Sequence, residues 1–179
     1  MQFKLSAIAA LASVAAASPV LNTRETTCAA DAVTAINGLT EASHKVGNSV
    51  STLTVQNSII RGQEIIQGTV QVVRSTVAGV GLPCEGELTE AEQQQICDAT
   101  SQLIIAEEDL LRALASKGGL LGSTPFSAPL AAAGRTLEGT TDELLFQIVG
   151  STPACGKSLD DLRKALDKDF QGLQSALSL

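Results

Sequence analysis

The sequence contains no Trp, no Tyr and a single His, and aromatic residues make up 2% of its 179 positions. One His excludes metal sites built from several His ligands, and it leaves Ser-His or Cys-His catalysis dependent on that one residue. Basic residues are also few, since 12 Lys and Arg stand against 19 Asp and Glu, for a formal net charge of −7. Nucleic-acid binding needs a cationic surface, so this anionic chain is not expected to bind nucleic acid.

Hydrophobic residues are plentiful at 44%, with only 17% charged residues, which is enough to bury a core. The first segment resembles a secretory signal peptide, because Lys4 precedes an apolar run over 5–14 and three Ala residues over 15–17. We expect a signal peptide over 1–17, an unstructured lead-in over 18–26 and one helical-bundle domain over 27–179. No apolar stretch is long enough for a transmembrane helix. The protein is therefore expected to be secreted, and extracellular or loosely associated with a cell wall.

Four cysteines, Cys28, Cys84, Cys97 and Cys155, form an even set in a chain expected to be secreted. They contain no C-x2-C pair, which argues against a metal site and favours two disulfides. Three pairings are possible. We favour Cys84–Cys97 with Cys28–Cys155 over Cys28–Cys84 with Cys97–Cys155, by a narrow margin. Each bond is expected to stabilise the fold by about 2–4 kcal/mol.

Apolar residues recur with a helical period through the whole domain. Five segments are expected to be helical: about 27–50, 54–77, 89–117, 128–149 and 158–178. The fourth is either kinked or broken near Gly139, where residues 140–143 repeat a capping-box pattern, and residues 120–125 are expected to be a loop. Short loops between five helices predict an all-α, antiparallel bundle. An up-and-down arrangement brings all four cysteines to one end of it.

Catalytic chemistry has little support in the sequence. His44 lies off the apolar stripe of its helix, so it is expected on the surface. Glu107, Glu108 and Asp109 are consecutive, and consecutive helical residues point about 100° apart, so they do not form one site. We find no nucleophile elbow, P-loop or dinucleotide fingerprint. The sequence therefore predicts no catalytic residues, no metal and no cofactor, and a protein that is not an enzyme.

The second helix is apolar over a wide arc, while Ala-rich faces elsewhere could leave space between helices. A cavity for an acyl chain or another apolar molecule is one interpretation. The alternatives are an ordinary packed core, or helices that lay their apolar faces on a hydrophobic surface. The candidates for lining such a site are Ile59, Ile66, Val70, Val73, Leu103, Leu110, Phe146 and Phe170.

Several stretches resemble one family of secreted fungal proteins. These are the TEAE helix opening over 89–92 after a Gly/Pro loop, TPFSAP over 124–129, and LDDLRKALDKDF over 159–170. The chain is similar to four-cysteine members of the hydrophobic surface-binding protein A and cell-wall galactomannoprotein family. This resemblance implies an all-helical fold, adsorption to hydrophobic surfaces and, as in some relatives, fatty-acid binding between helices. It supplies no catalytic motif.

The expected function is therefore non-enzymatic binding of apolar ligands, such as fatty acids, or of hydrophobic surfaces. The alternative is a secreted inhibitor or effector that binds a protein partner through its helical surface. Small disulfide-bonded helical bundles that inhibit cell-wall enzymes have a similar size and composition, but their cysteine spacing differs from that of this chain.

Overall fold

The computed structural model describes residues 24–79 and 87–177. Five long helices dominate it: α1 (Arg24–Ser51), α2 (Ser58–Gly79), α3 (Glu90–Ser116), α5 (Ser127–Ser151) and α6 (Gly156–Leu177). A short helix, α4 (Gly118–Gly122), and two 3-10 turns, η1 (Val55–Asn57) and η2 (Pro153–Cys155), connect them. The described ranges contain no β-strand. The predicted all-α class is confirmed, whereas the signal peptide expected over 1–17 lies outside the described residues.

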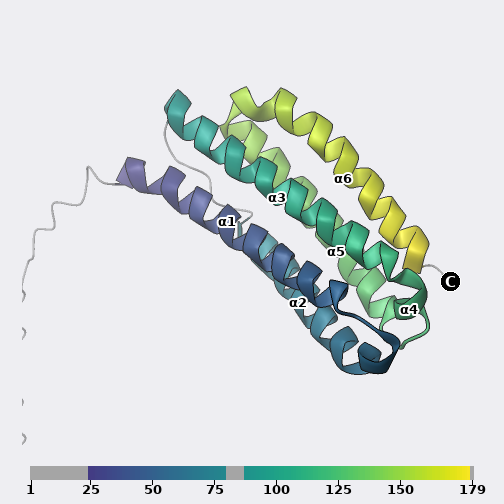
Figure 1. The fold of residues 1–179 in the computed structure, drawn as a ribbon. Coiled ribbons are helices and arrows are strands. Elements are labelled where there is room, and N and C mark those ends of the chain that lie inside the picture. The colour runs from purple at the N-terminus through teal and green to yellow at the C-terminus, as the bar shows by residue number, and fades with distance from the viewer. Residues whose placement is uncertain (1–23, 80–86, 178–179) are drawn as a thin grey trace, which may run out of the picture.

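The long helices alternate in direction, with α1, α3 and α6 running one way and α2 and α5 the other (Figure 1). Helix α3 packs against α1 and α6, α1 packs against α2, α2 against α5, and α5 against α6. The five helices therefore close into a ring, in which α3 and α5 are not neighbours. This is the up-and-down arrangement expected from short loops.

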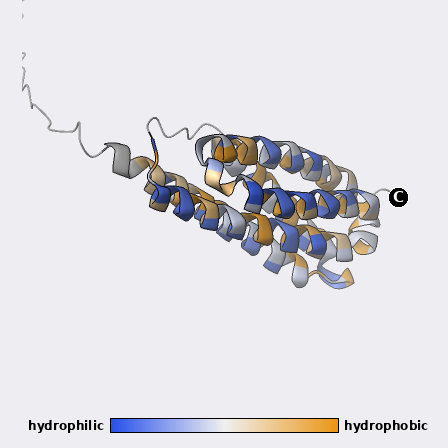
Figure 2. Ribbon diagram, turned by 90° about the horizontal axis from the view of Figure 1, so that it is seen from above, coloured by the Kyte–Doolittle hydropathy of each residue, from blue (hydrophilic) through white to orange (hydrophobic). Residues whose placement is uncertain are grey.

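Each long helix buries one face and exposes another, and hydrophobic and hydrophilic residues are interleaved along it (Figure 2). Helix α6 has the clearest pattern, because its buried residues are spaced by three, four or seven positions, which keeps them on one face. These residues are Leu159, Leu166, Phe170, Leu173 and Leu177. The core extends from this row through the ring to apolar residues of α1, α3 and α5.

The predicted capping box at the start of α3 is confirmed. The Thr89 hydroxyl accepts a hydrogen bond from the Glu92 amide at 3.3 Å, and the Thr89 amide donates to the Glu92 carboxylate at 2.9 Å. These bonds satisfy two amides that a helix start would otherwise leave unpaired. The Thr89 hydroxyl also donates to the Glu92 carboxylate at 2.6 Å, and this bond, together with the one from the Thr89 amide, lowers the pKa of Glu92.

The break expected near Gly139 does not occur, because α5 continues from Ser127 to Ser151. The capping-box pattern over 140–143 lies inside this helix. There the Thr140 hydroxyl donates to the Thr136 carbonyl at 3.0 Å instead of capping a new helix. A Thr in a helix interior commonly forms this bond to the carbonyl four residues earlier. The loop expected over 120–125 is also partly wrong, since residues 118–122 form α4.

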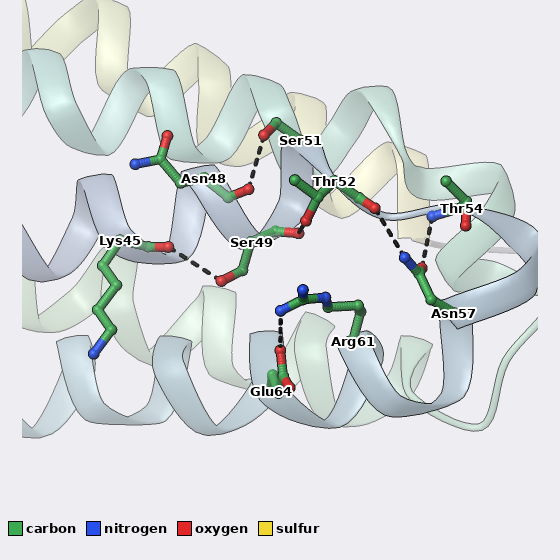
Figure 3. Close-up of polar contacts among 9 residues, drawn as sticks. All are labelled: Lys45, Asn48, Ser49, Ser51, Thr52, Thr54, Asn57, Arg61 and Glu64. Carbon is green, nitrogen blue, oxygen red and sulfur yellow. Dashed lines mark hydrogen bonds and ion pairs between the residues drawn. The ribbon is translucent and has the colours of Figure 1, made fainter.

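Hydroxyl and amide groups close the turn between α1 and α2 (Figure 3). The Ser51 hydroxyl donates to the Asn48 carbonyl at 2.8 Å, and the Thr52 hydroxyl donates to the Ser49 carbonyl at 3.0 Å. The Asn57 side chain then bonds the Thr52 carbonyl at 3.0 Å. Carbonyls at the end of α1 are thus satisfied locally, so the chain can reverse direction within a few residues.

At the junction of α3 and α4, the chain contacts both this turn and α6. The Lys117 ammonium, at the end of α3, donates to the Leu53 carbonyl at 3.1 Å. Gly118 packs directly against α6, since a Cβ placed on it would lie 2.7 Å from the Ala176 carbonyl oxygen. Only a glycine permits this approach of two backbones without displacement.

Helix α2 buries most deeply a face other than the one that carries the candidates Ile59, Ile66, Val70 and Val73. Its buried residues are Gly62, Ile65, Thr69, Val72, Thr76 and Gly79. Two glycines of α2 let side chains of other segments pack closely against the helix. Phe126 fills the space beside Gly62, and Val46 fills the space beside Gly68. The Thr69 hydroxyl donates to the carbonyl of Ile65 at 2.8 Å, so it is buried without an unpaired group.

A disulfide joins Cys97 near the start of α3 to Cys155 at the start of α6, with 5.5 Å between their Cα atoms. The favoured pairing of Cys84 with Cys97 and Cys28 with Cys155 is therefore wrong, and this bond belongs to the second alternative. Helix α6 begins beside the start of α3. Cys97 therefore pairs with Cys155, which is distant in sequence, and not with the nearby Cys84. Of the two expected bonds the structure describes this one. Cys28 is not free, and Cys84 lies outside the described residues.

Candidate apolar ligand site

A pocket of about 490 Å³ opens between α1, α2, α3 and α5, at the end of the bundle where α1 and α3 begin. We call it the apolar pocket. Small and aliphatic side chains dominate its lining: Ala32, Ala35, Ile36, Leu39, Gly79, Ile96, Leu144, Gln147, Ile148, Gly150 and Ser151. Its volume falls within the range of about 300–1,000 Å³ that is usual for small-molecule sites.

Residues of small volume create the pocket. Ala32 and Ala35 face it from α1, where larger side chains would fill it. Gly79, the last residue of α2, lies at its inner end. A Cβ on Gly79 would be 3.8 Å from the Cδ1 atoms of both Leu39 and Leu144, so three helices converge at this point.

The polar groups at the rim are already engaged within α5. The Ser151 hydroxyl donates to the Gln147 carbonyl at 2.8 Å, and the Gln147 side-chain amide donates to the Glu143 carboxylate at 2.9 Å. Among the described residues, the lining contains no charged side chain. The pocket is therefore suited to an uncharged hydrocarbon segment.

The disulfide lies next to the pocket along the chain. Ile96, which lines the pocket, precedes Cys97, and Ile148 of the lining accepts a hydrogen bond from the Thr152 amide at 2.8 Å. The Cys155 amide in turn donates to the Thr152 carbonyl at 2.9 Å. The covalent link between α3 and α6 thus fixes one border of the site.

The Glu107 carboxyl is the one ionisable group that lies wholly inside the described part of the bundle. It is fully buried, and its hydrogen-bond partner is the Thr141 hydroxyl, at 3.1 Å. Burial raises the pKa of Glu107 to about 8, although the bond from Thr141 opposes the rise. Neighbouring Glu108 pairs with Arg112 at 2.9 Å, while Asp109 is exposed. The three acids therefore point in different directions, as predicted.

The structure scatters the eight residues expected to line a site. Leu103, Leu110 and Phe170 are buried in the core. Ile66, Val70 and Val73 are partly buried on α2. Ile59 is 59% exposed and Phe146 is 76% exposed. None of the eight lines the apolar pocket, and Phe146 borders a separate hollow of about 230 Å³ between α5 and α6.

Residues of α1 and α5 take the place that α2 was expected to fill. Ile36 and Leu39 belong to the apolar stripe of the first predicted helix. Leu144 and Ile148 lie in the fourth predicted helix. The available signal was the pair Ala32 and Ala35 beside that stripe. Small residues next to large apolar ones leave space that neither can fill.

Three exposed aliphatic residues lie close together in the chain at the opposite end of the molecule, Val55 in η1 and Ile59 and Ile60 in the first turn of α2. Val55 is 72% exposed, Ile59 is 59% exposed and Ile60 is 70% exposed. We call these three residues the turn patch. Exposed apolar groups gathered in one place are more informative than isolated ones, because they often mark an interaction site.

Other chemistry finds no support among the described residues. His44 is exposed on α1, as expected. No group of three or more His, Cys, Asp or Glu side chains within 24–79 and 87–177 could hold a metal ion. None of the helices in these ranges combines the length and the hydropathy needed to cross a bilayer.

Comparison with known proteins identifies the fold. No family model matches the chain, and no curated protein matches it. The structure is similar to the crystal structure of AFMP4P in complex with palmitic acid, with a TM-score of 0.63 and 14% sequence identity. The similarity covers 84% of this chain and 99% of AFMP4P. At this identity the likeness establishes a shared helical fold, that of a protein crystallised with a fatty acid.

Proposed function

We propose that the protein binds a long-chain apolar ligand, such as a fatty acid, in the apolar pocket, and that it acts as a secreted protein without catalytic activity. The observation that carries this proposal is the pocket itself, which has about 490 Å³ of space and no charged side chain among the described residues that line it. The shared fold of AFMP4P, which was crystallised with palmitic acid, supports it.

The energetics favour an alkyl chain over a polar ligand. Each methylene group moved from water into an apolar site gains about 0.8 kcal/mol. Ile36, Leu39 and Ile148 offer aliphatic contacts from two helices, and the rim groups of Gln147 and Ser151 are occupied within α5. A ligand therefore gains affinity through chain length, and a short-chain acid is expected to bind weakly.

Native mass spectrometry of the oxidised protein with palmitic acid tests the proposal. We expect a one-to-one adduct. The variant Ala35→Phe places a ring in the pocket and should abolish the adduct, because the space is then filled. Ala30→Phe is the matched control, since Ala30 is exposed on the same helix and does not line the pocket.

The outcomes are distinct. An adduct with wild type and Ala30→Phe, but not with Ala35→Phe, supports the pocket as the binding site. Equal adducts with all three proteins would place binding elsewhere. A wild-type protein that takes up no fatty acid of any chain length would contradict the proposed function.

Adsorption to hydrophobic surfaces is a second candidate, favoured by the turn patch. Its three aliphatic side chains are exposed at the end of the bundle opposite the pocket. Replacing Val55, Ile59 and Ile60 by Ser should reduce retention on octyl-agarose while leaving palmitic-acid uptake unchanged. Unchanged retention would argue against this candidate and leave the ligand-binding proposal intact.

A further inference from the structure

Three of the buried polar side chains lie in the middle of the bundle. Ser43 of α1, Glu107 of α3 and Thr141 of α5 are each at most 1% exposed. The Thr141 hydroxyl donates to the two Glu107 oxygens at 3.1 and 3.4 Å. The Ser43 hydroxyl has no hydrogen-bond partner among the described residues. We call these residues the polar layer.

The polar layer lies one helical turn deeper than the inner end of the apolar pocket. Leu39 and Leu144 form that end. Ser43 is four residues beyond Leu39, or about 6 Å along α1, and Thr141 is three residues before Leu144, or about 4.5 Å along α5. Because α1 begins at the pocket and α5 ends there, both steps lead toward the middle of the bundle (Figure 1).

The packing of α1 on α3 brings Glu107 to the same level. A Cβ on Gly47 would lie 4.0 Å from the Leu110 Cα atom, so these residues are side by side. The two helices run in the same direction. Four residues earlier, Ser43 is therefore level with Ala106, the residue next to Glu107.

This layer has unused hydrogen-bonding capacity. Glu107 takes part in none of the ion pairs of the described residues, and its hydrogen bond comes from one hydroxyl. Burial favours its protonated form, whose O–H is a donor. The Ser43 hydroxyl is a second donor without an acceptor. Buried polar groups left in this state are costly, so a partner is favoured there.

Building on the proposed function, we infer that the polar layer receives the polar end of the ligand, which enters head first with its alkyl tail in the apolar pocket. The ligand class is a long-chain amphiphile with an uncharged, hydroxyl-bearing end, such as a fatty alcohol or a protonated fatty acid. A hydroxyl can accept from Ser43 and donate to Glu107. An anionic end is disfavoured, because no Lys or Arg is buried in the described part of the bundle and a buried charge needs a partner.

The test compares dodecan-1-ol with dodecyl methyl ether, which has the same chain but no O–H. Both ligands displace a fluorescent apolar probe from the oxidised protein at neutral pH. We expect the alcohol to bind about tenfold more tightly than the ether, because its O–H adds one hydrogen bond, to Glu107. We also expect the alcohol to bind more tightly than dodecanoate.

Ser43→Ala is the decisive variant. It removes an unpartnered hydroxyl, so it should fold as well as wild type, while the alcohol and the ether, whose oxygens can both accept from Ser43, should each bind about three- to tenfold more weakly. Thr76→Val is the matched control. Thr76 is equally buried, but its hydroxyl is already bonded to the Val72 carbonyl at 3.0 Å, so the affinities for both ligands should not change.

Equal binding of alcohol and ether by wild type, or unchanged affinities for both ligands in Ser43→Ala, would overturn the inference while the proposed function stands. Tighter binding of dodecanoate than of the alcohol would also overturn it. Failure of every ligand to displace the probe would instead contradict the proposed function, and the inference with it.

Discussion

Glu107 on α3 and Thr141 on α5 meet inside the ring of helices, where the Thr141 hydroxyl donates to the Glu107 carboxyl at 3.1 Å. The two helices are not neighbours in the ring, so this bond crosses the interior. This hydrogen bond joins the buried faces of α3 and α5. The stability of the core therefore depends on whether the Glu107 carboxyl is charged.

The stability of the protein should therefore depend on pH. The pKa of Glu107 is raised to about 8 in the folded state, against 4.5 for an unperturbed Glu. Between these values the folded protein keeps a proton that the unfolded chain has lost. The free energy of unfolding should then fall by about 1.4 kcal/mol per pH unit as pH rises through this window.

Glu107→Gln removes this titration and should flatten the curve. Urea unfolding at pH 5, 6, 7 and 8 gives the free energy of unfolding of wild type and variant. The difference between the two proteins isolates Glu107, because the contributions of other groups cancel. Parallel curves for the two proteins would show that Glu107 is solvated in the folded state.

The close approach of α4 to α6 predicts opposite effects at two adjacent glycines. Gly118→Ala should destabilise the protein by about 1–3 kcal/mol, because the new Cβ would lie 2.7 Å from the Ala176 carbonyl oxygen. Gly119→Ala meets nothing within 4 Å and should stabilise by about 0.5–1 kcal/mol. Thermal unfolding of both variants checks the contrast, and shifts of the same sign would refute it.

The capping box at the start of α3 should be worth about 1 kcal/mol. Thr89→Ala removes the hydroxyl that accepts from the Glu92 amide, and substitutions of this kind typically cost that amount. Thr34→Ala is the control, since the hydroxyl of Thr34 is exposed in a helix interior and bonds the Ala30 carbonyl. It should be neutral or slightly stabilising in chemical denaturation. Equal losses for the two variants would rule out a specific capping contribution.

The disulfide between Cys97 and Cys155 closes a segment of 58 residues. Replacing both cysteines by Ser should lower the free energy of unfolding by about 2–4 kcal/mol, because the unfolded chain regains conformational freedom. Chemical denaturation of the oxidised wild type and the double variant measures this difference. An unchanged midpoint would mean that the bond adds nothing beyond the noncovalent contacts between α3 and α6.

The helices and their order could be predicted from the sequence, because local signals determine them. The capping box at Thr89 and the apolar period of α6 each appear within a few residues. The same kind of signal failed at residues 140–143, where the pattern of a helix start lies inside α5. Local sequence cannot distinguish these cases, since tertiary packing decides whether a helix continues.

The orientation of α2 could not be predicted from hydrophobicity alone. Its Ile and Val residues surround the helix, so more than one face could have been buried. Packing selected the face with Gly62, Thr69 and Thr76, which lets neighbouring side chains approach closely. Shape complementarity, which hydropathy does not report, was decisive.

A cavity was one of the interpretations of the sequence, but its position was not predicted, for a related reason. Its lining comes from four helices, and its volume depends on small residues such as Ala35 and Gly79 rather than on a stripe of large ones. Glu107 was noticed only as part of an acidic triplet. Its burial opposite Thr141 depends on the way α3 sits in the ring.

The disulfide beside the pocket has a thermodynamic consequence for binding. Ile96 and Cys97 are adjacent in α3, so the covalent bond holds the pocket border in place before any ligand arrives. A pocket that is already rigid loses little conformational entropy when a ligand binds, so more of the contact energy contributes to affinity. Under the proposed function, reduction of the bond is expected to weaken ligand binding by freeing this border to move, although no lining residue changes.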